Sequence, residues 1–409
     1  MGSGALTSNR HDRLSALQLR VLVLVGLAVL MDGFDVQAMG FVAPAIIHAW
    51  GVSKASLGPV FGAGLFGMLV GSLGLSVLAD RVGRRPVMLG ATLFFACGML
   101  ATTRVTTIGE LEAIRFVTGL GLGAIMPNAM ALAGEQSAAE SRVTMMMLVS
   151  CGFTGGAVIG GLVSAALIPA FGWQAAFYVG GAFPLVLVAL MFGALPESKE
   201  FVSQRAPGVS RTSAPVARLF RDGRTRTTLL LWAVNFLNLI NLYFLANWLP
   251  TIATSAGMST SSAVLLGTML QVGGVLGTVI MGPVIDRVGF RRVLVPVFFV
   301  AAIAIALIGR PGIPVAVLFA VVTVAGLCII GGQPAVNAFA ASYYPTSLRS
   351  TGIGWSLGIG RIGSILGPTV GGELIRRQWS NTSIFATVAV PAAVSAFLVY
   401  LIRNDPAGS

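Results

Sequence analysis

The stretch Leu78-Ala79-Asp80-Arg81-Val82-Gly83-Arg84-Arg85 decides the fold, because its centre occurs twice in the chain. Asp80-Arg81-Val82-Gly83 returns 206 residues later as Asp286-Arg287-Val288-Gly289, and two arginines closely follow each copy. Arg142 and Arg349, which open later apolar segments, keep nearly the same separation of 207 residues. Self-similarity at a fixed offset is the mark of internal duplication. The sequence therefore predicts two homologous halves.

Long apolar runs surround both copies of this stretch. Of 409 residues, 56% are hydrophobic and 10% are charged, against about 25% charged residues in ordinary soluble domains. A membrane helix needs about 20 mostly apolar residues, and the chain contains twelve such stretches. They cover residues 20–48, 56–79, 86–105, 108–133, 141–169, 174–195, 228–253, 262–285, 293–309, 314–339, 347–373 and 380–402. This pattern excludes a soluble protein and predicts an all-α membrane protein with twelve transmembrane helices.

The distribution of basic residues predicts the orientation in the membrane. Of the 26 Lys and Arg residues, 19 fall on the side that holds both termini and 5 on the other side. Because cytoplasmic loops carry an excess of Lys and Arg, we expect both termini in the cytoplasm. The net charge of +12 then reflects topology, and we expect no nucleic-acid partner. A polar stretch predicts the division into residues 1–195, a cytoplasmic linker 196–227 and residues 228–409.

These features resemble the major facilitator superfamily. The stretch from Leu78 to Arg85 matches its signature loop, and Arg115-Phe116-Val117-Thr118-Gly119-Leu120-Gly121 is similar to its motif in the fourth span. One departure is Ser76, where the signature usually has glycine. The resemblance covers nearly the whole chain. It implies two pseudo-symmetric six-helix halves that transport a small molecule by alternating access.

Two acidic residues, Asp32 and Asp35, lie near the middle of the first span. A charge at that depth costs roughly 2.5–3.5 kcal/mol on insertion scales. Residues three apart share a helix face, and neighbouring carboxylates in a low dielectric disfavour each other's ionisation. At least one of them is expected to hold a proton near neutral pH, as a proton-coupled transporter requires. The alternative is a structural pair bonded to neighbouring helices.

The segment Asp32-Gly33-Phe34-Asp35 is similar to the Asp-Gly-x-Asp signature of the aromatic acid:proton symporter family. Three further segments agree in order and position: residues 195–198 (Leu-Pro-Glu-Ser), 247–250 (Asn-Trp-Leu-Pro) and 351–363, with its repeated glycines. The resemblance implies proton-coupled uptake of hydroxybenzoates, benzoate or phenylpropionates across the bacterial inner membrane.

Two arginines lie inside predicted spans. Arg361 lies about 13 residues, or roughly 20 Å, into the eleventh span. Its guanidinium suits both parts of an aromatic acid. It binds a carboxylate with two parallel hydrogen bonds, and it stacks on the face of an aromatic ring. The alternative for Arg361 is a salt bridge to the other half. Arg115 in the fourth span is expected to pair with Asp32 or Asp35 and to sense their protonation; it could instead bind the ligand, or form a purely structural pair.

Several polar and aromatic residues in the spans are further candidates for substrate contact. Amides and hydroxyls at membrane depth either bond neighbouring helices or bind a ligand, and both alternatives stay open for this set. Trp248 is expected at the outer membrane interface. The substrate candidates are Phe34, Asn235, Asn238, Tyr243, Gln333 and Asn337.

Charged residues at the ends of the spans predict a cytoplasmic gate. Opposite charges recur around both copies of the signature loop, and we expect them to hold an outward-open state together. The alternative is that these positive charges only control topology, and both roles can hold together. The gate candidates are Asp80, Arg84, Glu135, Arg142, Asp286 and Arg349.

Other function classes lack their motifs. The sequence has no GxxxxGK[ST] phosphate loop, no GxSxG and no HExxH, so we expect neither an ATP-driven pump nor an enzyme. We expect no metal and no cofactor, with the proton gradient as energy source, and a monomer working in the lipid bilayer. The alternatives to aromatic-acid uptake are a symporter or exporter of another organic anion, and a transporter-like chemoreceptor for aromatic acids.

Overall fold

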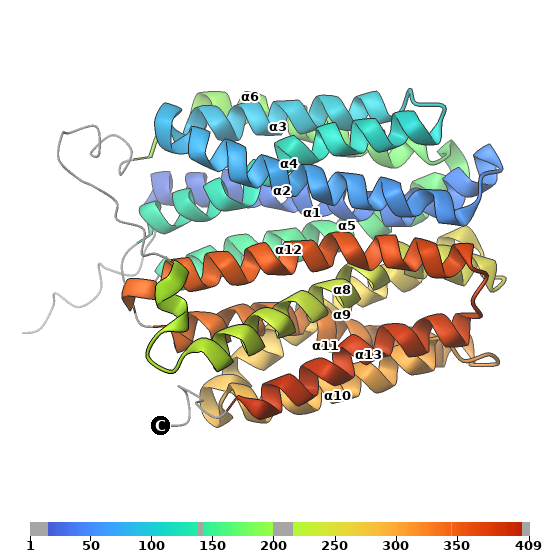
Figure 1. Ribbon diagram of the computed structural model, residues 1–409. Helices are drawn as coiled ribbons and strands as arrows, with labels where there is room; N and C mark the ends of the chain where they lie inside the picture. Colours follow the sequence, from blue (N-terminus) through green and yellow to red (C-terminus); the bar gives the residue numbers. More distant parts are fainter. Residues whose placement is uncertain (1–14, 138–141, 199–215, 345, 403–409) are drawn as a thin grey trace, which may run out of the picture.

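A computed structural model describes residues 15–137, 142–198, 216–344 and 346–402. These residues form twelve long α-helices that run side by side along one direction, together with two short 3-10 helices (Figure 1). The long helices are α1 (Ala16–Trp50), α2 (Leu57–Val82), α3 (Arg84–Thr102), α4 (Ile108–Gln136), α5 (Arg142–Phe171), α6 (Gln174–Ala194), α8 (Thr225–Ser255), α9 (Thr260–Val288), α10 (Phe290–Ile308), α11 (Val315–Tyr343), α12 (Thr346–Arg376) and α13 (Asn381–Leu401). The short ones are η1 (Lys54–Ser56) and η2 (Val216–Phe220).

The helices form two groups of six. Figure 1 shows α1 to α6, coloured blue to green, on one side of the bundle and α8 to α13 on the other. Ten of the helices are long and apolar enough to cross a membrane. The other two, α1 and α12, carry Asp32, Asp35 and Arg361. The predicted all-α membrane fold with two six-helix halves is confirmed, and each predicted span agrees with a helix to within four residues.

A single glycine joins two helices at the equivalent place in each half. Gly83 separates α2 from α3 with φ 111°, and Gly289 separates α9 from α10 with φ 89°. Residues that carry a side chain rarely adopt such a positive φ, whereas glycine does so at little cost. The duplicated stretch therefore makes the same tight corner twice.

The two halves meet at one end of the bundle. We call the end where α6 finishes and α8 begins the linker end, and the opposite end the far end. At the far end, Ser261 of α9 donates to the carbonyl of Ala165 in α5 at 3.2 Å. Nearby, a Cβ on Gly58 of α2 would lie 3.3 Å from the Cα of Gly372 in α12. The outer ends of α2 and α12, and of α5 and α9, are therefore closed against each other.

Two aromatic side chains fill this seam in equivalent positions. The ring of Phe41 in α1 lies where α5 and α9 cross, 3.1 Å from the Cβ positions of both Gly161 and Gly267. Trp248 of α8 lies where α2 and α12 cross, and its indole N–H donates to the carbonyl of Pro368 at 2.8 Å. The two aromatic residues are 207 positions apart, which matches the offset of the duplication.

The structure corrects the prediction for Trp248. Its side chain is fully buried and meets Phe61 of α2 edge to face, with ring centroids 5.1 Å apart. It lies between helices of both halves, so its side chain is not exposed on the surface of the bundle. The sequence places Trp248 at the correct depth, but it does not show which side of α8 is covered.

Within the first half, α1 and α5 approach each other backbone to backbone. A Cβ on Gly156 would lie 1.7 Å from the carbonyl oxygen of Leu30, and one on Gly33 would lie 1.9 Å from that of Phe153. Small residues permit such close helix contact in membranes. This crossing fixes the middle of α1, where Asp32 and Asp35 lie.

We predict that Gly156→Ala lowers the stability of the protein, because its methyl group would enter the backbone of α1. Overpacking of this kind costs about 1–3 kcal/mol or more, and thermal unfolding of detergent-purified protein measures it. Gly155→Ala is the matched control, since a Cβ at Gly155 meets nothing within 4 Å. Equal melting temperatures for the two variants would show that α1 and α5 are not in contact here.

Candidate functional site

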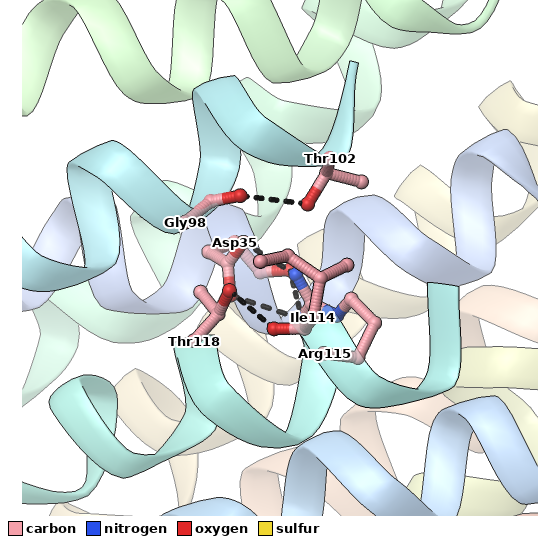
Figure 2. A network of polar contacts seen from close by, with 6 residues as sticks. All are labelled: Asp35, Gly98, Thr102, Ile114, Arg115 and Thr118. Atoms are coloured by element: carbon pink, nitrogen blue, oxygen red, sulfur yellow. Dashed lines mark hydrogen bonds and ion pairs between the residues drawn. The ribbon is translucent and has the colours of Figure 1, made fainter. Parts of the chain in front are cut away.

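A buried ion pair lies at the centre of the first half. Nη1 and Nη2 of Arg115 in α4 donate to Oδ1 and Oδ2 of Asp35 in α1, at 2.8 and 3.0 Å (Figure 2). Both side chains are buried. The hydroxyl of Thr118, one turn further along α4, donates to the carbonyl of Ile114 at 2.7 Å. The two-pronged contact matches guanidinium to carboxylate, so Asp35 and Arg115 neutralise each other.

Asp32 lies one turn before Asp35 on α1 and has a different environment. Its side chain is 1% exposed, and neither carboxylate oxygen has a hydrogen-bond partner among the described residues. A buried charge without donors is costly. Asp32 is therefore the acidic group in this region for which the surrounding protein supplies no hydrogen bond.

The charges nearest to Asp32 come from both halves. Asp35 acts on it from the same helix, and Arg361 acts on it from α12. Tyr243 of α8, which is buried, is within electrostatic reach of both Arg361 and Asp32. Three of the predicted site residues therefore converge from α1, α8 and α12, midway along each helix.

Four predicted substrate residues form one amide network inside the second half. Asn238 donates to Gln333 at 2.7 Å, and Gln333 donates to Asn235 at 2.8 Å and to Asn337 at 3.2 Å. Asn235 also donates to the hydroxyl of Ser356 at 2.9 Å. The network ties α8, α11 and α12 together. Asn235 and Asn238 are buried, whereas Gln333 and Asn337 are partly exposed.

Phe34 does not join this group. Its ring is 1% exposed and lies 3.3 Å from the Cβ position of Gly160 and 2.9 Å from that of Gly180. It therefore packs between α1, α5 and α6 inside the first half. Its role as a ring contact stays a prediction.

The predicted gate residues fall into two groups. Arg84 at the start of α3 pairs with Glu135 near the end of α4, and Ser198 also donates to Glu135. The Arg84–Glu135 pair lies within the first half, and Ser198 belongs to the linker that follows it. Asp286 forms no ion pair among the described residues. The side chains of Asp80, Arg142 and Arg349 lie outside the described part of the chain.

Two contacts were not predicted from the sequence. Oε1 of Glu197 accepts from the backbone N–H groups of Arg84 and Arg85 at 2.9 and 3.2 Å, and so caps the start of α3. A carboxylate there complements the helix dipole. Asn241, in the amide orientation that satisfies both groups, donates to the carbonyl of Val388 and accepts from the N–H of Ala392. A single sequence carries no signal for such distant pairs.

Comparison with known proteins identifies the family. The family model of the Major Facilitator Superfamily matches residues 25–269 and 231–409. The chain belongs to the major facilitator superfamily. It is 38% identical over 416 residues to the 4-hydroxybenzoate transporter PcaK of Pseudomonas aeruginosa, covering 95% of this chain and 93% of that protein. It is 35% identical over 412 residues to a gallate transporter of Pseudomonas putida, covering 94% and 92% of the two chains.

Solved structures support the same fold. The crystal structure of a D-xylose-proton symporter matches with a TM-score of 0.77 at 16% identity, covering 96% of this chain and 99% of that one. At this identity the likeness concerns the fold alone. The family model and the relatives show that this superfamily member is a multi-pass membrane transporter and not an enzyme. Within the superfamily, it belongs to the family of the aromatic-acid transporters.

We predict that Asp35→Asn strongly destabilises the protein, because it leaves the Arg115 guanidinium buried without a counter-ion. Removing one partner of a buried ion pair costs about 3–5 kcal/mol, which thermal unfolding detects. The double variant Asp35→Asn/Arg115→Gln should melt above the single variant, since it removes both charges.

The control is Glu373→Gln. Glu373 pairs with Arg376 and Arg377 on the surface of α12, and exposed pairs contribute little to stability. If Asp35→Asn melts no lower than Glu373→Gln, the pair with Arg115 does not carry the stability that its burial implies.

Proposed function

We propose that this transporter takes up a small aromatic carboxylate, such as a hydroxybenzoate, together with protons across the bacterial inner membrane. The relatives named as transporters of 4-hydroxybenzoate and gallate support the substrate class. The proton gradient supplies the energy, with no cofactor, and one chain is the functional unit.

The proposal rests on the environment of Asp32. This residue is buried, has no hydrogen-bond donor among the described residues, and shares the interface between the halves with Arg361 and Tyr243. A carboxylate in such a place is suited to gain and lose a proton. An arginine beside it is suited to hold the carboxylate of a substrate.

The amide network supports a role in recognition. Gln333 and Asn337 are the partly exposed members, and we assign them to hydrogen bonds with ring substituents. Asn235 and Asn238 hold α8 against its neighbours and keep the network in place. Tyr243 is within electrostatic reach of Arg361, and we assign it to contact with the substrate ring.

The closed far end fits one state of an alternating-access cycle. The excess of Lys and Arg on the side of the linker end supports a cytoplasmic location for that end. The far end then faces outward, and the seam around Phe41 and Trp248 closes the site to the outside. In the cycle, protonation and substrate loading occur with this seam open, and the halves then rock to release both inside.

We predict that Asp32→Asn abolishes accumulation of 4-hydroxybenzoate driven by a pH gradient, because the amide cannot exchange a proton. The variant should fold normally and still exchange labelled for unlabelled substrate across proteoliposomes. Unchanged pH-driven accumulation by Asp32→Asn would remove Asp32 from the proton pathway.

We predict that Arg361→Lys weakens binding of aromatic acids by about tenfold or more, because the ammonium lacks the planar fork that holds a carboxylate. Equilibrium binding of labelled 4-hydroxybenzoate measures the loss. Arg310→Lys, at an exposed position after α10, is the matched control. Equal affinity in both variants contradicts the anchor role of Arg361.

A further inference from the structure

Two buried glutamines below the closed seam have amide atoms without partners. Gln37 of α1 and Gln271 of α9 are 2% and 3% exposed. Among the described residues, Oε1 of Gln37 and Nε2 of Gln271 have no hydrogen-bond partner. Buried polar atoms without partners are costly and uncommon in folded proteins. One lone acceptor and one lone donor therefore lie inside the protein, one in each half.

The contact between Phe41 and Gly267 places these two glutamines. Cε1 of Phe41 lies 3.1 Å from the Cβ position of Gly267. Gln37 precedes Phe41 by four residues and Gln271 follows Gly267 by four, so each glutamine shares a helix face with its seam residue. Because α1 runs toward the far end and α9 runs away from it, both glutamines lie about 6 Å further in than the seam. Their amides therefore meet between α1 and α9 at one depth.

A hydroxyl group fits between a lone acceptor and a lone donor. It carries one O–H to donate and two lone pairs to accept. It can therefore donate to Oε1 of Gln37 and accept from Nε2 of Gln271 at the same time. A methyl group of similar size does neither, an ammonium group only donates, and a carboxylate only accepts. The two amide atoms are thus complementary to a neutral hydroxyl.

This hydroxyl site lies closer to the far end than Arg361 does. A Cβ on Gly371 would lie 2.5 Å from Nε1 of Trp248, the seam residue equivalent to Phe41. Since Arg361 precedes Gly371 by ten residues, its backbone lies about 15 Å further in than the seam. An acid held by its carboxylate at Arg361 therefore extends its opposite end toward the two glutamines.

The amide network of the second half lies deeper than the two glutamines. Its member Asn235 is next to Gly360, whose Cβ position is 3.0 Å from Oδ1 of Asn235. The network therefore lies at the depth of Arg361. Gln333 and Asn337 are accordingly placed for groups near the carboxylate, and the opposite end of the ring belongs to other residues.

We infer that Gln37 and Gln271 together bind a hydroxyl group at the ring position opposite the carboxylate, and so select a 4-hydroxylated aromatic acid. This inference rests on the proposed function and adds the position of the ring substituent. Because Gln37 belongs to the first half and Gln271 to the second, a hydroxyl bonded to both joins the halves directly below the seam. A ligand without it leaves both amide atoms unpaired, and sites of this kind reject such analogues.

The test compares the binding of 4-hydroxybenzoate and 4-methylbenzoate, which are similar in shape and differ in hydrogen bonding at one position. Titration calorimetry on detergent-purified protein measures both affinities in the native chain, in Gln37→Met and in Gln271→Met. Methionine keeps the length of glutamine and removes its amide. Gln136→Met is the matched control, because the Gln136 side chain is also buried and unpartnered among the described residues but lies at the end of α4, near the linker end.

We expect the native protein and Gln136→Met to bind 4-hydroxybenzoate at least about tenfold more tightly than 4-methylbenzoate. This ratio should fall by about fivefold or more in Gln37→Met and in Gln271→Met, while the affinity for 4-methylbenzoate is kept. A merely structural role of the two amides would weaken both ligands equally.

Three results would contradict these expectations at separate points. A native ratio in either Gln37→Met or Gln271→Met overturns the shared hydroxyl site. Equal binding of 3-hydroxybenzoate and 4-hydroxybenzoate by the native protein overturns the assignment to the position opposite the carboxylate. If the native protein binds none of these acids, the proposed function itself is wrong.

Discussion

A charge buried away from water must be neutralised by something close to it, and this constraint governs the centre of the protein. Asp35 satisfies it through Arg115 within the first half. Asp32 has no hydrogen-bond partner among the described residues, and the arginine within electrostatic reach of it, Arg361, belongs to the second half. One carboxylate is therefore neutralised inside its own half, whereas the other lies within reach of a charge from the opposite half.

The backbone packing places these charges. Glycines at the crossing of α1 and α5 bring the two backbones into contact, which fixes the height and rotation of α1. The crossings of α2 with α12 and of α5 with α9 hold the far end closed. Small and aromatic side chains make up these seams.

Much of the fold could be predicted from the sequence, because apolar length and a repeated motif are local signals. The depth of Asp32, Asp35, Arg115 and Arg361 followed from the same count. The rotation of each helix did not, since the spans are apolar on all sides. For that reason the sequence did not show that Phe34 packs between α1, α5 and α6 or that Trp248 is buried between the halves, and the cap made by Glu197 was not predicted. Which amides bond one another also depends on contacts about 100 residues apart, which one sequence does not reveal.

The paired aromatic residues of the seam reflect the internal duplication of the chain. Phe41 lies against α5 and α9, and Trp248 lies against α12 and α2, so the two positions exchange under the pseudo-twofold axis. Each half thus supplies one aromatic residue to close the far end against the other half. Since the indole of Trp248 donates a hydrogen bond that a phenyl ring cannot make, the two copies differ in chemistry at this position.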